Sequence, residues 1–410
     1  MKVLHVIPSV SPVRGGPSQA VLEMVKSLRD EGVDAFIVTT DDDGERRLEV
    51  STDGWVHYRG VPIRFFPRFS PNINSVREFA FSGALTTWLK KNIAQYDLVH
   101  VHAVFSYPST AAMAIARKQK IPYIVRPLGQ LCEWSLQQSA LKKHLYLSLI
   151  ERANIEGSQG LHLTSQQEKR EAAKLQLKNC SAFVVPHGLS FSPFLVNARQ
   201  RLRTLLKLPA DETIILFLSR IHPKKGLEYL IPALGQLKDY PFTFVLAGSG
   251  DPDYEAEVRS LLKTANIDNR TLLPGFVTGE TKNLMLQGSD LYALTSHSEN
   301  FGVAVLEALA VGLTTVVTPG VALAEEIKHH QLGYVSELSV NAIRGVLKAC
   351  LQSPEVAVAV GDRARKFVLE NYTWQKNADS LIEIYTTLLR QQRPQVQFSE
   401  SDHAAYSHLQ

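Results

Sequence analysis

Cysteine is scarce in this chain of 410 residues, and its three copies lie far apart. Cys132, Cys180 and Cys350 lack the close spacing that metal-binding or disulfide-forming cysteines show. Neither a disulfide framework nor a zinc site is therefore indicated, and a reducing compartment is expected.

Long apolar runs are also missing. No stretch approaches the roughly 18 uncharged apolar residues of a transmembrane helix, and the apolar run from Met1 to Ile7 is too short for a signal peptide. We therefore expect a cytoplasmic protein. With 45% hydrophobic and 20% charged residues, the chain is an ordinary globular one, long enough for two domains.

Two common signatures of cofactor or polymer binding are absent as well. Gly15 and Gly16 follow an apolar run, but their spacing does not match the Gly-x-Gly-x-x-Gly pattern of dinucleotide-binding redox proteins. No dense basic patch with interleaved aromatic residues indicates nucleic-acid binding. The sequence thus predicts no bound cofactor and no nucleic-acid partner.

Short β-branched runs alternate with helical stretches along the whole chain, a pattern typical of parallel sheets with crossover helices. The fold class is therefore α/β. The expected strands are 3–7, 35–39, 63–66, 98–101, 123–125, 161–164, 182–185, 214–219, 243–247, 271–273, 291–294 and 314–317.

Turn residues at 186–188 mark the expected domain boundary, because a strand ends there and a new series of elements begins. We expect domains at 1–188 and 189–374. The polar, aperiodic end of the chain, 391–410, is expected to be a disordered tail.

Two carboxylates with seven residues between them, Glu299 and Glu307, surround the start of a helix-forming stretch. If Ser298 or Asn300 caps this helix, its free N–H groups suit an anion such as a phosphate. The helix rises roughly 10 Å up to Glu307, a span comparable to a pyrophosphate with a sugar at each end. Such spacing also recurs by chance, but Glu307 lies among apolar residues, where a carboxylate needs solvent or a ligand.

A second loop supplies positive charge. Arg220 and Lys225 follow the expected strand 214–219 and precede Gly226, an arrangement suited to binding a diphosphate. The alternative is a solvated basic turn. The Gly15-Gly16 pair before a helix also favours a phosphate, although such pairs are common in turns.

In combination, Arg220 with Lys225, Pro274-Gly-Phe-Val277, and Glu299 with Glu307 resemble the donor-binding motifs of the retaining glycosyltransferases of family 4. Within that family the chain is most similar to bacterial enzymes of exopolysaccharide or envelope polysaccharide synthesis. The resemblance implies the GT-B fold, in which two Rossmann-like domains face each other across a cleft. The first domain, which binds the acceptor, would be completed by a last helix at about 375–389.

The resemblance assigns Arg220 and Lys225 to the diphosphate of a nucleotide sugar and Glu307 to its ribose. Glu299 would hold hydroxyls of the transferred sugar, and Lys224 would be the more solvent-facing of the two lysines. Glu299, Arg220 and Lys225 are thus the implied catalytic residues. The remaining implied donor-site residues are Gly15, Gly16, Phe276, Val277, Asn300, Phe301 and Gly302.

One position departs from the family. Many members carry a histidine near the transferred sugar where this chain has Leu128. Arg126 and His102 are the candidates for the sugar and acceptor side instead. A structural histidine at a strand end is the alternative for His102.

The expected reaction is transfer of a hexose, with glucose from UDP-glucose as the first choice and GDP-mannose and UDP-galactose left open. The acceptor would be a sugar or a lipid-linked oligosaccharide. Retention of configuration and independence from metal ions are implied by the resemblance; the Asp-x-Asp sequences at 41–43 and 251–253 are interpreted as loops. A nucleotide-sugar epimerase and a nucleotide-binding regulatory or redox protein remain the alternatives.

Residues 101–152 carry seven Lys and Arg but two Glu, and 141–152 has the pattern of an amphipathic helix with a basic flank. A solvated face over a core stripe is the simpler interpretation. The other is contact with an anionic membrane surface or with a lipid-diphosphate acceptor, which would place the protein peripherally at the inner face of the membrane.

Overall fold

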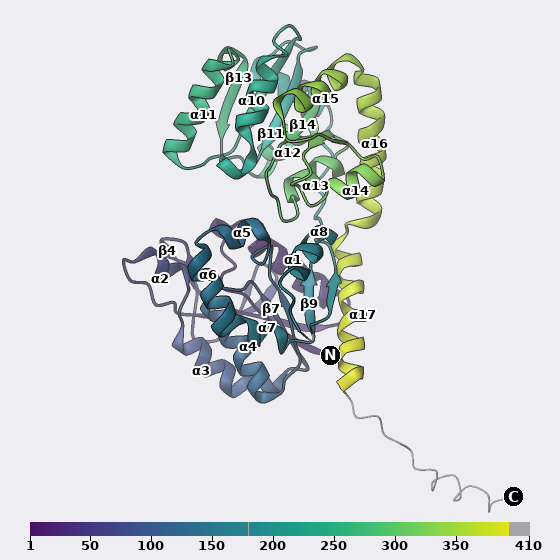
Figure 1. The fold of residues 1–410 in the computed structure, drawn as a ribbon. Coiled ribbons are helices and arrows are strands. Elements are labelled where there is room, and N and C mark those ends of the chain that lie inside the picture. Colours follow the sequence, from purple (N-terminus) through teal and green to yellow (C-terminus); the bar gives the residue numbers. More distant parts are fainter. Residues whose placement is uncertain (179, 393–410) are drawn as a thin grey trace, which may run out of the picture.

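The computed structural model describes residues 1–178 and 180–392. They form two α/β domains, one above the other in Figure 1, each built on a largely parallel sheet. This is the GT-B arrangement expected from the resemblance. The end of the expected tail, 393–410, lies outside the described residues, whereas 391 and 392 belong to the last helix.

The first domain has an eight-stranded sheet. Its strands are parallel except at one edge, where β5 pairs antiparallel with β6. Their order is β10 (Ala182–Val184), β9 (Gly160–Leu163), β8 (Tyr123–Arg126), β7 (Leu98–His102), β1 (Lys2–Val6), β2 (Asp34–Thr40), β6 (Val61–Phe66) and β5 (Trp55–Tyr58).

The second domain has a six-stranded sheet in which every pair is parallel. Connections between parallel strands need crossovers, and helices supply them. The order is β13 (Thr271–Gly275), β12 (Phe242–Ala247), β11 (Thr213–Leu218), β14 (Leu291–Leu294), β15 (Thr314–Val317) and β16 (Tyr334–Val335).

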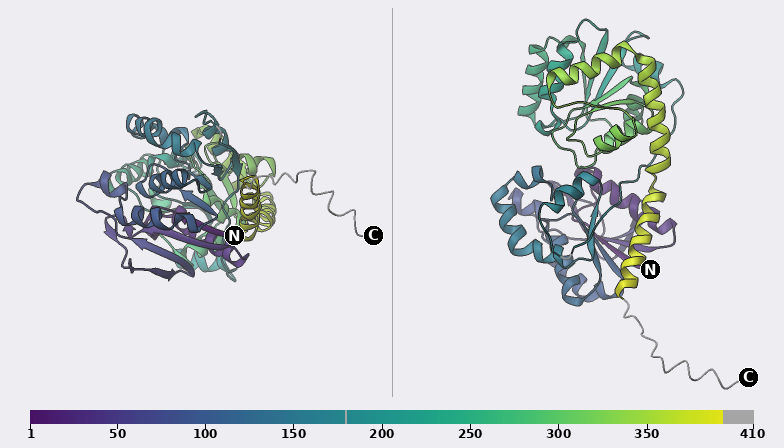
Figure 2. Two further views of the ribbon diagram at one scale, coloured as in Figure 1. Left: turned by 90° about the horizontal axis from the view of Figure 1, so that it is seen from below. Right: turned by 45° about the vertical axis from the view of Figure 1, so that its right-hand side comes forward.

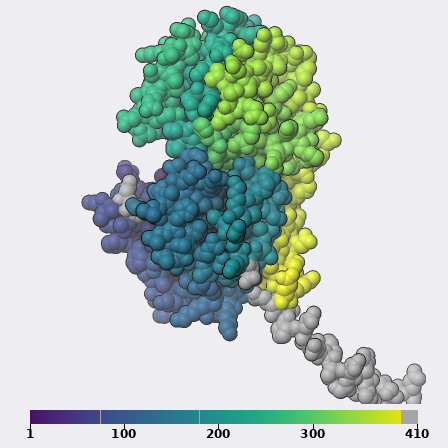
Figure 3. Space-filling view, viewed as in Figure 1, coloured from purple at the N-terminus to yellow at the C-terminus, as the bar shows by residue number. Residues whose placement is uncertain are grey.

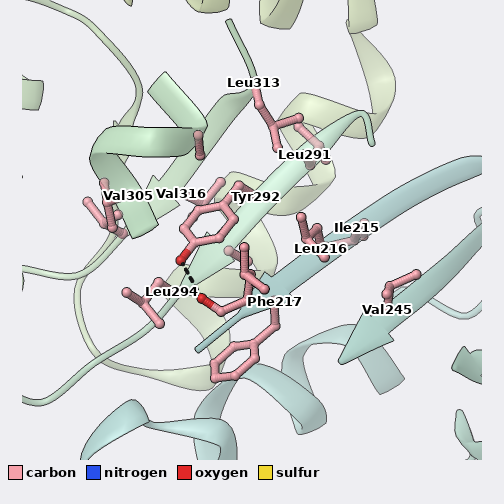
Figure 4. Packing of buried hydrophobic residues seen from close by; sticks show 14 of the residues in the cluster. Ile215, Leu216, Phe217, Val245, Leu291, Tyr292, Leu294, Val305, Leu313 and Val316 are labelled. Atoms are coloured by element: carbon pink, nitrogen blue, oxygen red, sulfur yellow. Dashed lines mark hydrogen bonds between the residues drawn. The ribbon is translucent and has the colours of Figure 1, made fainter. Parts of the chain in front are cut away.

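Both faces of each sheet are covered by helices, which explains why the central strands are apolar at nearly every position. In the second domain, Tyr292 lies at the centre of such a strand, and its hydroxyl donates to the carbonyl of Leu218 at 3.1 Å (Figure 4). This hydrogen bond satisfies the one polar atom of a fully buried ring. Apolar burial on both faces therefore fixes the strand edges from which the functional loops emerge.

The helices follow the strands in sequence. The first domain contains α1 (Gly16–Asp30), α2 (Asn74–Glu78), α3 (Gly83–Asn92), α4 (Tyr107–Gln119), α5 (Glu133–Gln137), α6 (Ala140–Tyr146), a π-helical turn (Leu147–Glu151), α7 (Arg152–Glu156) and α8 (Gln166–Ala173). The second contains α9 (Ala198–Leu206), α10 (Leu227–Gly235), α11 (Pro252–Thr264), α12 (Gly279–Gly288), α13 (Val303–Ala310), α14 (Ala324–His329), α15 (Val340–Gln352) and α16 (Pro354–Asn371).

The last helix, α17 (Trp374–Gln392), leaves the second domain and packs on α1 of the first. The right view of Figure 2 shows this yellow helix running from the second domain along the first. Leu381 and Tyr385 of α17 are fully buried in the core of the first domain. The carbonyl of Trp374 accepts a hydrogen bond from Ser27 of α1 at 2.9 Å. The first strand and the last described helix therefore share one core.

All twelve expected strands are present, with bounds that differ by two residues at most. Of the strands in the two main sheets, β5 and β16 were not expected. β5 is a half-exposed edge strand without a continuous apolar run, and β16 is an edge strand of two residues. None of the described helices combines the length and the hydropathy that crossing a bilayer requires.

Candidate active site

A cavity of about 560 Å³ lies between the two domains, at the carboxyl ends of their parallel strands. Ligands of open parallel sheets bind at this edge. Both domains line the cavity, and six of the residues implied by the resemblance are among its walls: Gly15, Gly16, Arg220, Phe276, Val277 and Glu307.

Lys225 and Glu299 form an ion pair in the second domain. Lys225 ends a short 3₁₀ turn (Pro223–Lys225) after β11 and is 6% exposed, while Glu299 follows β14. A lysine so deeply buried needs a charged partner. The cation that the resemblance places at the diphosphate and the carboxylate that it places at the sugar therefore contact each other.

Backbone contacts hold this pair in place. Gly226 adopts a φ of 66°, and Thr295 donates from its hydroxyl to the Gly226 carbonyl at 2.9 Å. The backbone of Glu299 bonds to the loop after β15, with its N–H donating to the Gly320 carbonyl at 2.7 Å. Three loops at the edge of one sheet thus position the lysine and the carboxylate.

The helix after Glu299 begins differently from what the sequence suggested. Neither Ser298 nor Asn300 caps α13; its N-cap is Gly302, with a φ of 88° and no side-chain hydrogen bond. A residue without a side chain allows this left-handed turn. Because no side chain caps them, the first N–H groups of α13 are available to an anion.

Glu307, on α13, has a partner that the sequence did not reveal. Lys282 of α12 lies with Nζ 2.6 Å from Glu307 Oε1, and both residues line the cavity. Lys282 could not be found from spacing because it is 25 positions away on another helix. The isolation of Glu307 in an apolar sequence did indicate that it needed a partner.

Arg59 of the first domain also lines the cavity and was not predicted. It occupies, with Gly60, the two-residue turn between β5 and β6, where its φ is 51°. Its guanidinium donates to Gln19 at 3.2 Å, and Gln19 donates to Glu23 at 2.6 Å. The one feature of the sequence that points to Arg59 is a non-glycine residue in such a turn.

The two domains touch each other, and the space-filling view in Figure 3 shows them in direct contact. Asn300 donates to the Thr164 hydroxyl of the first domain at 3.5 Å. A Cβ atom on Gly129 would lie 2.5 Å from the Asn300 side chain, so only glycine permits this approach. The loop that carries Glu299 is therefore shaped by both domains.

Lys224 is half-buried and is the more exposed of the two lysines, as the resemblance implied, since Lys225 is buried. Lys224 Nζ lies 4.4 Å from the ring centroid of Trp134 on α5, across the domain boundary. Burial lowers the pKa of this lysine, and Glu299 acts in the opposite direction. Lys224 thus makes a cation–π contact between the domains, on the loop next to Lys225.

His102 and Arg126 lie at the carboxyl ends of β7 and β8 but are fully buried, and neither lines the cavity. His102 shares a hydrogen bond of 3.0 Å with His5. Arg126 lies 2.9 Å from Nδ1 of His187, which does line the cavity. His100 completes the cluster through a contact of 2.7 Å with the Tyr385 hydroxyl of α17.

Because of this histidine cluster, we expect the free energy of unfolding to fall at acidic pH. Burial, then the charge of Arg126, lowers the pKa of His5 to about 3, and burial also lowers those of His100 and His102 well below the usual value. Their contribution to stability is complete above the unfolded value of about 6.5 and is lost as the pH falls below it, by up to about 1.4 kcal/mol per pH unit for each histidine. Urea titrations at pH 8 and 5.5 should show this fall.

Replacing His5 by glutamine should make the fall smaller, because one titrating group is removed. His57→Gln is the matched control, since His57 is exposed. Equal pH dependence in wild type and His5→Gln would contradict the assignment.

Among the described residues, His5, His100 and His102 are the three whose ligand atoms lie within 4.8 Å of one another, close enough for a metal. Both nitrogens of His100 already have partners, and the nearby charge of Arg126 disfavours a cation. The two Asp-x-Asp sequences have structural partners instead: Asp42 pairs with Arg14 and Arg68, and Asp251 caps α11.

Each domain matches a family model of known sequences. Residues 15–188 match the glycosyl transferase 4-like domain, and residues 198–367 match the glycosyl transferases group 1. The two segments together span most of both domains.

Individual relatives agree. The chain is 24% identical to a D-inositol 3-phosphate glycosyltransferase of Xylanimonas cellulosilytica over 90% of this chain and 91% of that protein. It is 25% identical to the putative teichuronic acid biosynthesis glycosyltransferase TuaC of Bacillus subtilis, over 75% of each.

Solved structures show the same fold. HepE of Anabaena, crystallised with UDP and glucose, superimposes with a TM-score of 0.73 at 18% identity, over 94% of this chain and all of that chain. The sucrose-phosphate synthase of Thermosynechococcus elongatus gives a TM-score of 0.75 at 18% identity, over 95% and 100%. Taken with the two matched domains, these findings place the chain among the glycosyltransferases, as a GT4-type enzyme of the GT-B fold.

Proposed function

We propose that this enzyme transfers glucose from UDP-glucose, with retention of configuration, to a sugar or lipid-linked oligosaccharide in polysaccharide synthesis. The observation that carries the proposal is the Lys225–Glu299 ion pair beside a helix start without a side-chain cap. HepE, a structural neighbour, was crystallised with UDP and glucose, which supports this donor. Other relatives are named for inositol phosphate and for malate, so the range of acceptors to be tested is wider than polysaccharides.

In the proposed reaction, negative charge grows on the β-phosphate as the bond to the sugar loosens. Arg220, Lys225 and the N–H groups at the start of α13 stabilise that charge. Glu299, together with the backbone N–H groups of Asn300, Phe301 and Gly302, holds the hydroxyls of the sugar, because carboxylates accept what hydroxyls donate. The leaving phosphate oxygen takes the proton of the acceptor, so that transfer occurs on one face of the sugar.

Gly15 and Gly16 approach the diphosphate from the first domain, where a backbone without side chains allows close contact. Glu307 binds the ribose, and Phe276, which is 75% exposed inside the cavity, lies with Val277 at the base. The reaction needs no metal ion in this scheme, because the cations of the protein neutralise the phosphates.

The test is incubation of the purified enzyme with UDP-glucose, GDP-mannose or UDP-galactose, without acceptor, followed by NMR. Release of UDP and free glucose, initially as the α anomer, supports the proposal. An altered sugar still bound to the nucleotide would indicate an epimerase, and the β anomer would contradict retention. Activity should survive EDTA; a loss that Mn²⁺ or Mg²⁺ restores would contradict metal independence.

We further propose that the first domain contacts an anionic membrane surface through α6 and the π-helical turn after it. Leu141, Leu145 and Leu149 recur every four positions and are 84%, 57% and 72% exposed. Such a stripe is unusual on a surface helix, whose apolar face normally packs inward. Lys142 is exposed on the same helix and complements anionic lipid, whereas Lys143 donates to the Ser135 carbonyl at 2.6 Å.

Flotation with vesicles of phosphatidylglycerol and phosphatidylcholine measures this contact. We expect the wild type to float with the vesicles, and the triple variant Leu141→Ser, Leu145→Ser and Leu149→Ser to remain behind, because the inserting side chains are lost. Leu205→Ser is the control, since Leu205 is 55% exposed on another helix. Equal flotation of wild type and triple variant would contradict the proposal.

A further inference from the structure

From the geometry of the cavity we infer that Lys282 is a second ribose-binding residue, which with Glu307 reads the vicinal 2′,3′-diol and makes the enzyme select ribonucleotides over deoxyribonucleotides. This inference rests on the proposed function, because it requires a nucleoside diphosphate in the cavity. It concerns a residue on α12, outside the sequence motifs that indicated the donor site.

The first step is the contact itself. Lys282 Nζ lies 2.6 Å from Glu307 Oε1, and the two side chains are 30% and 22% exposed toward the same cavity. Val303 and Ala304 line the cavity next to Glu307. An ion pair against apolar walls is screened less by solvent than one on an open surface.

The second step is hydrogen-bonding capacity. A hydroxyl both donates and accepts, whereas a carboxylate accepts and an ammonium group donates. Glu307 alone therefore accepts hydrogen bonds from the two hydroxyls of a diol. The lone pairs of the diol oxygens are then left without a donor. Lys282 supplies the missing donors, and hydrogen bonds to charged groups are the stronger ones.

The third step is rigidity. The helix that carries Lys282 is fixed on its other side: Glu280 pairs with Arg201 at 2.7 Å, and Asn283 bonds to Ser192 at 2.8 Å. α12 also packs against α9 and α13. Lys282 is thus held at the cavity by a fixed helix. A side chain held in this way distinguishes a ribose from a deoxyribose better than one that can move to fit either sugar.

The competing explanation is that the Lys282–Glu307 ion pair only joins α12 to α13 and has no role in binding ribose. Removing such a pair would change stability slightly, as half-exposed pairs do. It would alter the binding of a ribonucleotide and its deoxy analogue by the same factor. The ratio of the two dissociation constants separates the explanations.

The experiment is calorimetric titration of the full-length enzyme with UDP, 2′-deoxy-UDP and 3′-deoxy-UDP, and with GDP and its two deoxy analogues. For the wild type we expect a preference of about tenfold or more for the ribonucleotide, since each lost bond leaves a charged partner unpaired. In Lys282→Met the preference against at least one deoxy analogue should fall to about threefold or less. Lys263→Met, on α11, should keep the wild-type ratios.

Two failures are distinguishable. If the wild type binds a ribonucleoside diphosphate but Lys282→Met leaves both ratios unchanged, the role of Lys282 is wrong while the proposed donor class stands. If the wild type binds none of these diphosphates, the proposed function fails, and the inference fails with it.

Discussion

Glu299→Gln is expected to lower turnover of UDP-glucose by about 10²- to 10³-fold while the protein stays folded. Glutamine keeps the size of the side chain but loses the charge that pairs with Lys225 and the second strong acceptor for sugar hydroxyls. Alanine would be a poorer choice, because it would leave a buried lysine without any partner and so confuse loss of function with loss of stability.

The measurement is the initial rate of UDP release, together with the thermal midpoint of the same preparation. Glu257→Gln is the matched control, since Glu257 is exposed on α11. A folded Glu299→Gln enzyme with near-normal turnover would reject the assignment of Glu299 to the transferred sugar.

Gly226→Ala should be strongly destabilising, although it adds only one methyl group near the site. Its Cβ would lie 2.0 Å from the carbonyl oxygen of Thr295, and the φ of 66° is already unfavourable for alanine. Dihedral strain and displacement of a buried strand end each cost about 1–3 kcal/mol. We expect the thermal midpoint to fall by roughly 5–15 °C, since a domain of this size loses about 2–4 °C per kcal/mol.

Gly275→Ala separates the two contributions. Gly275 has a φ of 74°, but nothing lies within 4 Å of an added Cβ. Differential scanning calorimetry should show a much smaller shift for Gly275→Ala than for Gly226→Ala. Equal shifts would mean that dihedral strain alone accounts for the effect and that the contact with Thr295 relaxes.

The strands could be predicted because parallel sheets covered on both faces need apolar, β-branched segments, and β1, β11 and β14 are such segments. β5 could not, because as an edge strand it is half exposed and carries no such run. For α6 the periodicity of the leucines predicted a helix. It did not predict that these leucines face solvent and not the core.

For the candidate site, the sequence supplied the residues near the cavity, while the contacts between them depended on packing. Lys225 and Glu299 are 74 positions apart, and nothing in either loop indicated that they pair. Lys282 and Arg59 reach the cavity from a helix and a hairpin turn whose placement depends on strand order. The predicted helix cap was wrong because the N-cap of α13 is Gly302, which has no side chain and lies two residues after Asn300.

The packing of α17 on the first domain bears on how this protein folds during synthesis. Tyr385 is buried against α1 and bonded to His100, so the first domain has an incomplete core until α17 has left the ribosome. The second domain, whose core uses residues 189–372, can fold earlier even though it is made later. We therefore expect a nascent chain that ends before residue 374 to expose the apolar surface of α1 to chaperones.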